Sequence, residues 1–296
     1  MPPTSPRICR PISIPCCAKN SREAENAGRV PNWLSTHPSP QNRVQRVNTK
    51  LGEYPEGRGA SVRRDAYLRQ IDGIVFGPDP REGFFRGSTF YHPDMAFQIE
   101  FPRGFQGQNQ KQVVGAISPN QDAVVVVTLT GRGSPASASR EFFAQQGIEM
   151  GRAMRGDIGG MEAVTHEFAA VSGQTPVRGL ASFVEHGGRV FQLLGYTTTQ
   201  GWSRYDDMLV SSIESFERLR ERRYLDAQPM RLKIVPSSRL TDIDDIARRS
   251  PVGRDTLVLI NGGDRADAAF VKTVVGDDLA VEILREQQQR NRDRQR

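Results

Sequence analysis

The chain has 296 residues and a formal net charge of +6, with 25% charged and 37% hydrophobic residues. This composition is typical of a globular protein with polar extensions, and no apolar run approaches the roughly 18 to 20 residues that span a bilayer. We therefore expect no transmembrane segment, and the lack of a nucleic-acid-binding motif excludes nucleic acid as the expected partner.

The N-terminal stretch differs from the rest in composition. It holds all three cysteines, Cys9, Cys16 and Cys17, so we expect no disulfide framework in the folded part. It is rich in proline and lacks the unbroken apolar core of about 7 or more residues that marks a signal peptide. We expect residues 1–28 to be disordered.

Residues 29–85 combine short helical patterns with linkers. One helical pattern covers residues 40–47. A second apolar stripe predicts a helix that ends at Gly77-Pro78, and the following "PDPREGFFRGS" predicts a loop. The stripe consists of Ala66, Ile71, Ile74 and Val75.

Residues 86–220 begin with strand patterns. Phe97, Ile99 and Phe101 alternate in "TFYHPDMAFQIEFP", which predicts a strand with one buried face. "QVVGAIS" and "DAVVVVTLTG" predict two further strands. The second is apolar throughout its centre, which favours a position inside a sheet.

A helix, three strands and a second helix complete this region. "SPASASREFFAQQGIEMGRAM" has helical spacing, with Ser134 as N-cap, Pro135 as first residue and Ile148 on the apolar side. "GMEAVTHEFAA", "PVRGLASFVEH" and "RVFQLLGYT" predict strands, the last two joined by a primed turn at Gly187-Gly188. "QGWSRYDDMLVSSIESF" predicts a helix whose apolar residues lie three or four apart: Trp202, Tyr205, Leu209, Ile213 and Phe216. The fold class is therefore α+β, an antiparallel sheet covered by helices.

Residues 229–276 predict a small β-α-α-β module. Its strands are "MRLKIV" and "AFVKTVV". Thr241 is placed to cap the first helix, and Asp255 to cap the second, which Asn261-Gly262 ends. Residues 282–296 form a charged tail, either a frayed helix or disordered. We expect residues 86–220 and 229–276 to fold independently.

The chain lacks the motifs of a catalytic site. A zinc protease carries His-Glu-x-x-His on a helix, but here His166-Glu167 is followed by Ala170 and lies in a predicted strand. There is no G-x-S-x-G elbow, P-loop or dinucleotide fingerprint. His92 and His186 lie at predicted turns and are interpreted as surface or capping histidines. We expect no catalytic residue, metal or cofactor in this chain.

One segment nevertheless resembles a protease. "VPNWLSTHPSPQNRVQRV" resembles the last segment of the peptidase domain in zinc metalloendopeptidases of the HtpX / CAAX-prenyl-protease type, periplasmic branch, and residues 67–102 are similar to the junction that follows it. The resemblance implies that His37 and Arg43 belong to a loop near the zinc cleft. The zinc ligands and catalytic glutamate of that family precede this segment, so their absence is implied here. The alternative is that the residues around His37 form a capped helix start beside a packed Trp33.

Two further resemblances concern the folded regions. The region 86–220 resembles the PsbP-like fold, and the region 229–276 resembles a LysM module. LysM modules bind N-acetylglucosamine polymers, which implies a glycan groove here at Leu240, Thr241, Asn261 and Gly262. The alternative is that Asn261-Gly262 only ends a helix.

Three functional hypotheses follow. The first is that the chain is the non-catalytic accessory part of a zinc metalloprotease that acts in envelope protein quality control, either truncated or with a mis-assigned start. The second is a stand-alone envelope protein that binds peptidoglycan. The third is an adaptor for envelope proteins. The resemblances imply the periplasm or cell envelope as location.

Overall fold

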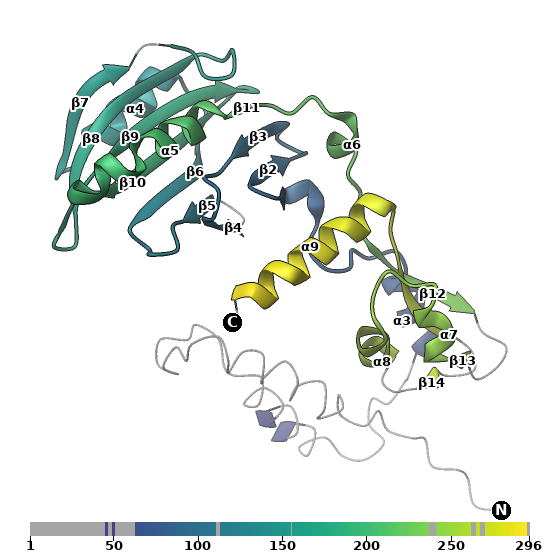
Figure 1. Cartoon of the computed structure of the whole chain (residues 1–296). Helices are drawn as coiled ribbons and strands as arrows, with labels where there is room; N and C mark the ends of the chain where they lie inside the picture. Colours follow the sequence, from purple (N-terminus) through teal and green to yellow (C-terminus); the bar gives the residue numbers. More distant parts are fainter. Residues whose placement is uncertain are drawn as a thin grey trace, which may run out of the picture. The chain divides into compact units, whose positions relative to one another are not determined.

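The computed structural model describes residues 45–46, 49–50, 63–110, 113–154, 156–236, 241–261, 265–266 and 270–294. The chain divides into two compact units (Figure 1). The larger unit comprises Gly77–Pro229 and Gly276–Gln287. The smaller unit takes its described residues from Met1–Phe76, Met230–Val275 and Gln288–Arg296. The expectation that residues 86–220 and 229–276 fold independently stays a prediction.

A seven-stranded antiparallel sheet forms the larger unit's framework, in the order β4-β5-β6-β10-β9-β8-β7. Strand β6 lies inside this sheet, between β5 and β10, as its apolar centre predicts. The primed turn between β9 and β10 is also confirmed, because Gly187 and Gly188 have φ values of 60° and 72°. The strands are β4 Gln106–Gln110, β5 Val113–Ile117, β6 Ala123–Gly131, β7 Ile148–Met154, β8 Ala163–Ser172, β9 Thr175–His186 and β10 Arg189–Thr198.

Helices cover both faces of this sheet. Helix α4 (Pro135–Phe143) packs over β7 to β10, and α5 (Trp202–Glu214) packs on the other face over β6, β9 and β10. Ser134 caps α4 as predicted, in a capping box with Ser137. Gly195 lets α5 approach closely, since an added Cβ would lie 3.1 Å from the Ile213 side chain. The predicted α+β arrangement of an antiparallel sheet between helices is therefore present.

A four-stranded sheet lies beside α5 on the same face of the large sheet. Its order is β1-β2-β3-β11. The ring of Phe97 lies 5.1 Å from the rings of both Phe191 and Phe216, so the two sheets share one core. The strands are β1 Phe84–Arg86, β2 Thr89–His92, β3 Phe97–Glu100 and β11 Glu217–Arg218, and two short 3₁₀ helices are η1 Pro80–Glu82 and η2 Thr199–Gly201.

The outer face of the four-stranded sheet is covered by helices α6 (Arg222–Leu225) and α9 (Asp278–Arg294). Leu279 and Ile283 of α9 are buried in one cluster with Phe84. Glu282 accepts hydrogen bonds from Arg86 and Arg223 at 2.8 and 2.9 Å. Of the two alternatives for the charged tail, a frayed helix or disorder, residues 282–294 are helical, and the first turns of α9 are packed.

The smaller unit has the predicted β-α-α-β order, in which β12 (Arg231–Pro236) pairs antiparallel with β15 (Phe270–Val275). Between them lie α7 (Ile243–Ala247), α8 (Arg254–Asn261) and a short pair, β13 (Thr241–Asp242) with β14 (Arg265–Ala266). Buried Ile243 and Leu257 hold the two helices against the strands.

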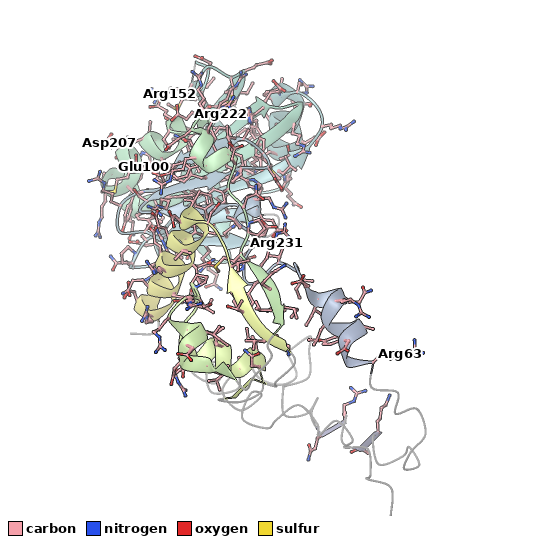
Figure 2. The ribbon with its side chains drawn as sticks, turned by 90° about the vertical axis from the view of Figure 1, so that its right-hand side faces the viewer. Arg63, Glu100, Arg152, Asp207, Arg222 and Arg231 are labelled. Carbon is pink, nitrogen blue, oxygen red and sulfur yellow. The ribbon has the colours of Figure 1, made fainter. Side chains whose placement is uncertain are left out.

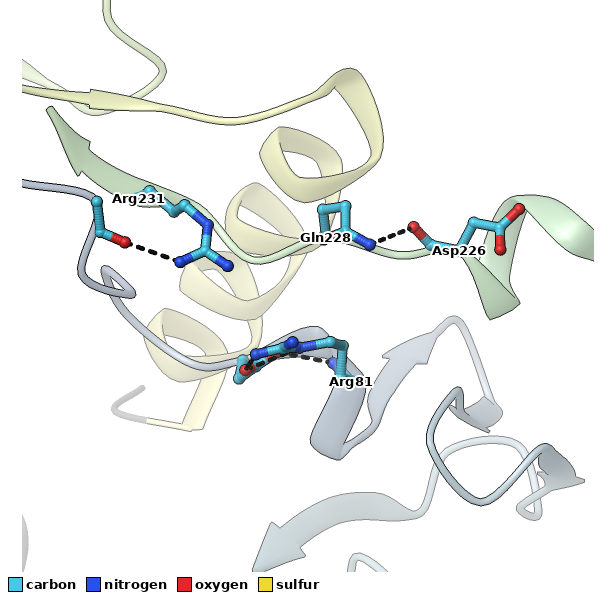
Figure 3. A network of polar contacts seen from close by, with 6 residues as sticks. Arg81, Asp226, Gln228 and Arg231 are labelled. Carbon is cyan, nitrogen blue, oxygen red and sulfur yellow. Dashed lines mark hydrogen bonds and ion pairs between the residues drawn. The ribbon is translucent and has the colours of Figure 1, made fainter.

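An upstream segment completes the smaller unit. After helix α3 (Arg64–Ile71), Gly73 donates to Leu232 O at 2.8 Å and Phe76 donates to Met230 O at 2.7 Å. Arg231 donates back to Gly73 O at 2.8 Å (Figure 3). Residues 73–76 therefore run beside β12 like a further strand.

Four local predictions were wrong. The predicted helix at 61–77 ends at Ile71, because Gly73 (φ 83°) turns the chain and the next residues pair with β12. The predicted loop after Gly77-Pro78 contains η1 and β1.

The helix predicted to reach Met154 ends at Phe143. Gly147 (φ 86°) redirects the chain, so Ile148 lies in edge strand β7. The caps of the small helices differ too: α7 begins at Ile243, after β13, so Thr241 does not immediately precede it, and Asp255 lies inside the first turn of α8.

We expect Leu209→Ala to destabilise the larger unit by about 2 to 5 kcal/mol, because it leaves a cavity where α5 meets the sheet. Leu209 is 0% exposed, whereas its neighbour Met208 is 49% exposed. Met208→Ala is therefore the matched control and should change the free energy of unfolding by less than about 0.5 kcal/mol. Denaturation in urea measures both, and equal effects would contradict the placement of α5.

A second prediction concerns Asp72. Its carboxylate accepts a hydrogen bond from the Ile234 amide at 2.8 Å, and this bond, with a smaller effect of Lys233, lowers the pKa of Asp72 below 3.8. The ionised group therefore stabilises the smaller unit above the unfolded pKa, and this contribution is lost as pH falls through the folded pKa. Asp72→Asn should lower the hydrogen-exchange protection of the Ile234 amide at pH 7, with the difference closing below about pH 4. Asp65→Asn is the control, and equal protection in the wild type and Asp72→Asn at pH 7 would refute the assignment.

Candidate functional site

A cavity of about 400 Å³ lies in the larger unit, between the four-stranded sheet and one end of the seven-stranded sheet. Ligand sites in proteins have volumes of about 300 to 1,000 Å³ and are mostly apolar, with a few polar groups. This cavity fits that description. Its apolar walls come from both sheets: Phe90, Met95, Phe97, Val114, Val127 and Phe191.

The rim of the cavity is partly open to solvent. Leu129 and Val113 lie there with 40% and 37% of their surface exposed. Asn109 on β4 donates its side-chain amide to Gly83 O at 2.9 Å, which ties β4 to the segment after η1. Glu82 also lines the cavity. The rim is thus built where β4, β5 and β6 meet the segment from η1 to β2.

His92 supplies the imidazole of the cavity wall. Its Nδ1 accepts a hydrogen bond from the Met95 amide at 3.2 Å, so in the neutral ring the proton lies on Nε2. The ring lies 5.2 Å from that of Phe97 and 6.1 Å from that of Phe90. Burial lowers the pKa of His92 below 6.5, although the charge of Asp94 acts in the opposite direction. His92 therefore presents a neutral N–H donor.

A second histidine fixes the turn that carries Met95. The Nε2 of His186 donates to Met95 O at 2.9 Å and to Ala96 O at 3.0 Å. His92 and His186 thus brace the turn between β2 and β3 from two sides. The interpretation of both as surface or capping histidines fits His92, which is half-buried and caps the turn that follows it. It does not fit His186, which is buried and bonds to a turn distant in the sequence.

A charged cluster lies elsewhere on the large sheet. Glu167 accepts hydrogen bonds from Arg152 at 2.8 Å and Arg178 at 3.0 Å, and the Arg178 guanidinium stacks over Trp202 (Arg152 is labelled in Figure 2). Burial would raise the pKa of Glu167, but the two arginines outweigh it and the pKa is lowered. This cluster is an ion-pair network in which the charges satisfy one another.

His166-Glu167, the incomplete protease motif, lies on strand β8 as expected. The ring of His166 meets that of Phe143 of α4 edge to face, with centroids 5.5 Å apart, while Glu167 bonds to the arginines. Successive residues of a strand point to opposite faces, so the two side chains cannot share a ligand. In the described part of the chain, no three His, Cys, Asp or Glu side chains are grouped to hold a metal ion.

The predicted site residues are not brought together in the described structure. His37, Arg43, Leu240 and Gly262 lie outside the described residues, and Thr241 lies in β13. Asn261 uses its side chain within the fold: it donates to Leu257 O at 2.9 Å and Lys272 O at 2.8 Å, and accepts from Lys272 N at 2.9 Å. These bonds favour the interpretation of Asn261 as a residue that ends α8 and ties it to β15. The glycan groove stays a prediction.

The cavity was not predicted from the sequence. Its signal was present in "TFYHPDMAF", where His92 alternates with Phe90 on one side of the strand and is followed by proline. The partners Val114, Val127 and Phe191 come from distant strands. Only the pairing of those strands brings them to the same place.

Comparisons with known proteins return no family model and no curated protein that matches the chain. CyanoP, the PsbP of Synechocystis sp. PCC 6803, is similar in structure, with 17% identity and a TM-score of 0.37 over 45% of this chain and 94% of that chain. LpqN of Mycobacterium tuberculosis, described as involved in cell envelope biogenesis, has 17% identity and a TM-score of 0.34 over 55% and 100%. A Pseudomonas aeruginosa protein described as a putative regulator has 16% identity and a TM-score of 0.30 over 40% and 88%. None of the three is described as a metalloprotease.

In the described part of the chain, no helix combines the length and apolar character needed to cross a membrane.

We expect the imidazole of His92 to titrate below pH 6.5 in an NMR titration of the full chain, because burial disfavours the charged ring. The unfolded chain then binds more protons than the folded chain, so stability is lost as pH falls from about 6.5 toward the folded pKa. His92→Gln should flatten this part of the stability curve. A midpoint at or above 6.5 would show that the ring is not enclosed.

Proposed function

We propose that this chain is a non-catalytic accessory or adaptor protein whose larger unit holds an apolar ligand group in the cavity beside His92. The observation that carries the proposal is the cavity itself, with aromatic and aliphatic walls, one imidazole and a partly open rim. Exposed cavities of this composition are the usual form of small-molecule sites. The role proposed is binding and presentation of a ligand.

The cell envelope or periplasm is the location we propose. Its support is the resemblance of the sequence to periplasmic metallopeptidases and LysM modules. On the same basis, an accessory role beside a zinc metalloprotease stays a proposal, in which the zinc and its ligands belong to another part of the protein or to a partner. This role implies that the partner is an envelope protein to which the ligand group belongs.

Peptidoglycan binding by the smaller unit is the second candidate. The β-α-α-β order of β12, α7, α8 and β15 favours it. Because Asn261 is engaged by Lys272 and Leu257, a groove there would depend on Thr241 and the residues around it. Retention of the full chain on peptidoglycan at high salt would support the groove, whereas loss of binding with salt would indicate only the arginine excess.

The cavity can be tested with the neutral fluorescent probe N-phenyl-1-naphthylamine. We expect the full chain to bind it, and Leu129→Trp to weaken binding by roughly tenfold or more, about 1.4 kcal/mol, because the larger ring fills the entrance. Leu129 is 40% exposed, so the variant should still fold.

The control is Val171→Trp, which adds the same ring at a position that is 65% exposed on β8 and does not line the cavity. It should bind the probe like the wild type. Equal weakening by the two variants, or no binding by the wild type, would refute the proposed function.

A further inference from the structure

The polar and apolar groups that line the cavity indicate which class of ligand it binds. We infer that it takes a neutral acyl compound, an amide or ester with an aliphatic chain, whose carbonyl oxygen accepts a hydrogen bond from Nε2 of His92 while the chain packs between the two sheets. This inference rests on the proposed function and names its ligand class.

The hydrogen-bond polarity comes from the position of His92. Its Nδ1 is already engaged by the Met95 amide at 3.2 Å, so the neutral ring offers only an N–H to a ligand. A ligand group that meets it must be an acceptor. A carbonyl satisfies this donor, whereas a hydrocarbon would leave it without a partner at a cost to binding.

The preference for an uncharged acceptor comes from the charges around the cavity. Among the described lining residues, the only charged side chain is Glu82, an acid. The charge of Arg189 acts on His92, but Arg189 is not among the described lining residues. A carboxylate bound there would lose its hydration beside the like charge of Glu82, which is costly in an apolar site. An amide or ester carbonyl avoids that cost and keeps the hydrogen bond.

The aliphatic chain is favoured by the remaining walls. Val114, Val127 and Phe191 of the large sheet and Phe90 and Phe97 of the small sheet line the cavity, and all are nearly fully buried. Met95 is held in place because its amide donates to Nδ1 of His92 and its carbonyl oxygen accepts from Nε2 of His186. The site is therefore largely formed before a ligand enters, which reduces the cost of ordering on binding.

The test compares octanamide with octanoate by calorimetry on the full chain at pH 7.5. We expect octanamide to bind at least tenfold more tightly. His92→Phe should weaken octanamide binding by roughly threefold to tenfold. His92→Gln keeps an N–H donor and should retain most of the octanamide affinity.

The outcomes separate the two proposals. The inference is overturned if octanoate binds as tightly as octanamide or more tightly, or if His92→Phe does not change octanamide binding. If the wild type still binds the probe, the proposed function stands in either case. Failure of the wild type to bind the probe and octanamide refutes both. The octanamide-to-octanoate ratio of the wild type decides the ligand class even if a variant does not fold.

Discussion

The packing of Phe97 is the constraint on which the larger unit depends. Its ring lies within 6.0 Å of Phe90 and 5.1 Å of Phe191 and Phe216, residues from the small sheet, the large sheet and the end of α5. One buried side chain of β3 therefore joins the small sheet to β10 and to the segment after α5, which lie much later in the sequence. Burial of such aromatic rings supplies much of the free energy that holds two layers together.

The cavity is a consequence of this arrangement. Helix α5 covers one part of the large sheet and the four-stranded sheet covers the neighbouring part. Beside Phe97, where β2 ends and β3 begins, His92 and Met95 of the β2–β3 turn line one side of the space. The imidazoles of His92 and His186 both form hydrogen bonds with the backbone of Met95, which fix the position of this turn. The result is a site with mostly apolar walls, in which His92 lies near the turn and Asn109, Gln110 and Thr128 supply further polar side chains.

Local patterns predicted the elements whose structure is decided locally. The apolar centre of β6, the glycine pair after β9 and the Ser134 cap all act within a few residues. Strand β7 escaped prediction because its helical spacing is overruled by pairing with β8. Residues 73–76 escaped for the same reason, since their partner, β12, lies more than 150 residues later along the chain. The cavity is lined by residues of the six strands β2, β3, β4, β5, β6 and β10, and no single stretch of sequence contains their pairing.

The most direct test of the account is the place where octanamide binds the full chain. Intermolecular nuclear Overhauser effects between the ligand's chain and assigned methyl groups measure it without any variant. The account predicts contacts to the methyl groups of Val114 and Val127, inside the cavity. Contacts confined to the shallow surface around Pro102 and Met208, or to the smaller unit, would contradict it.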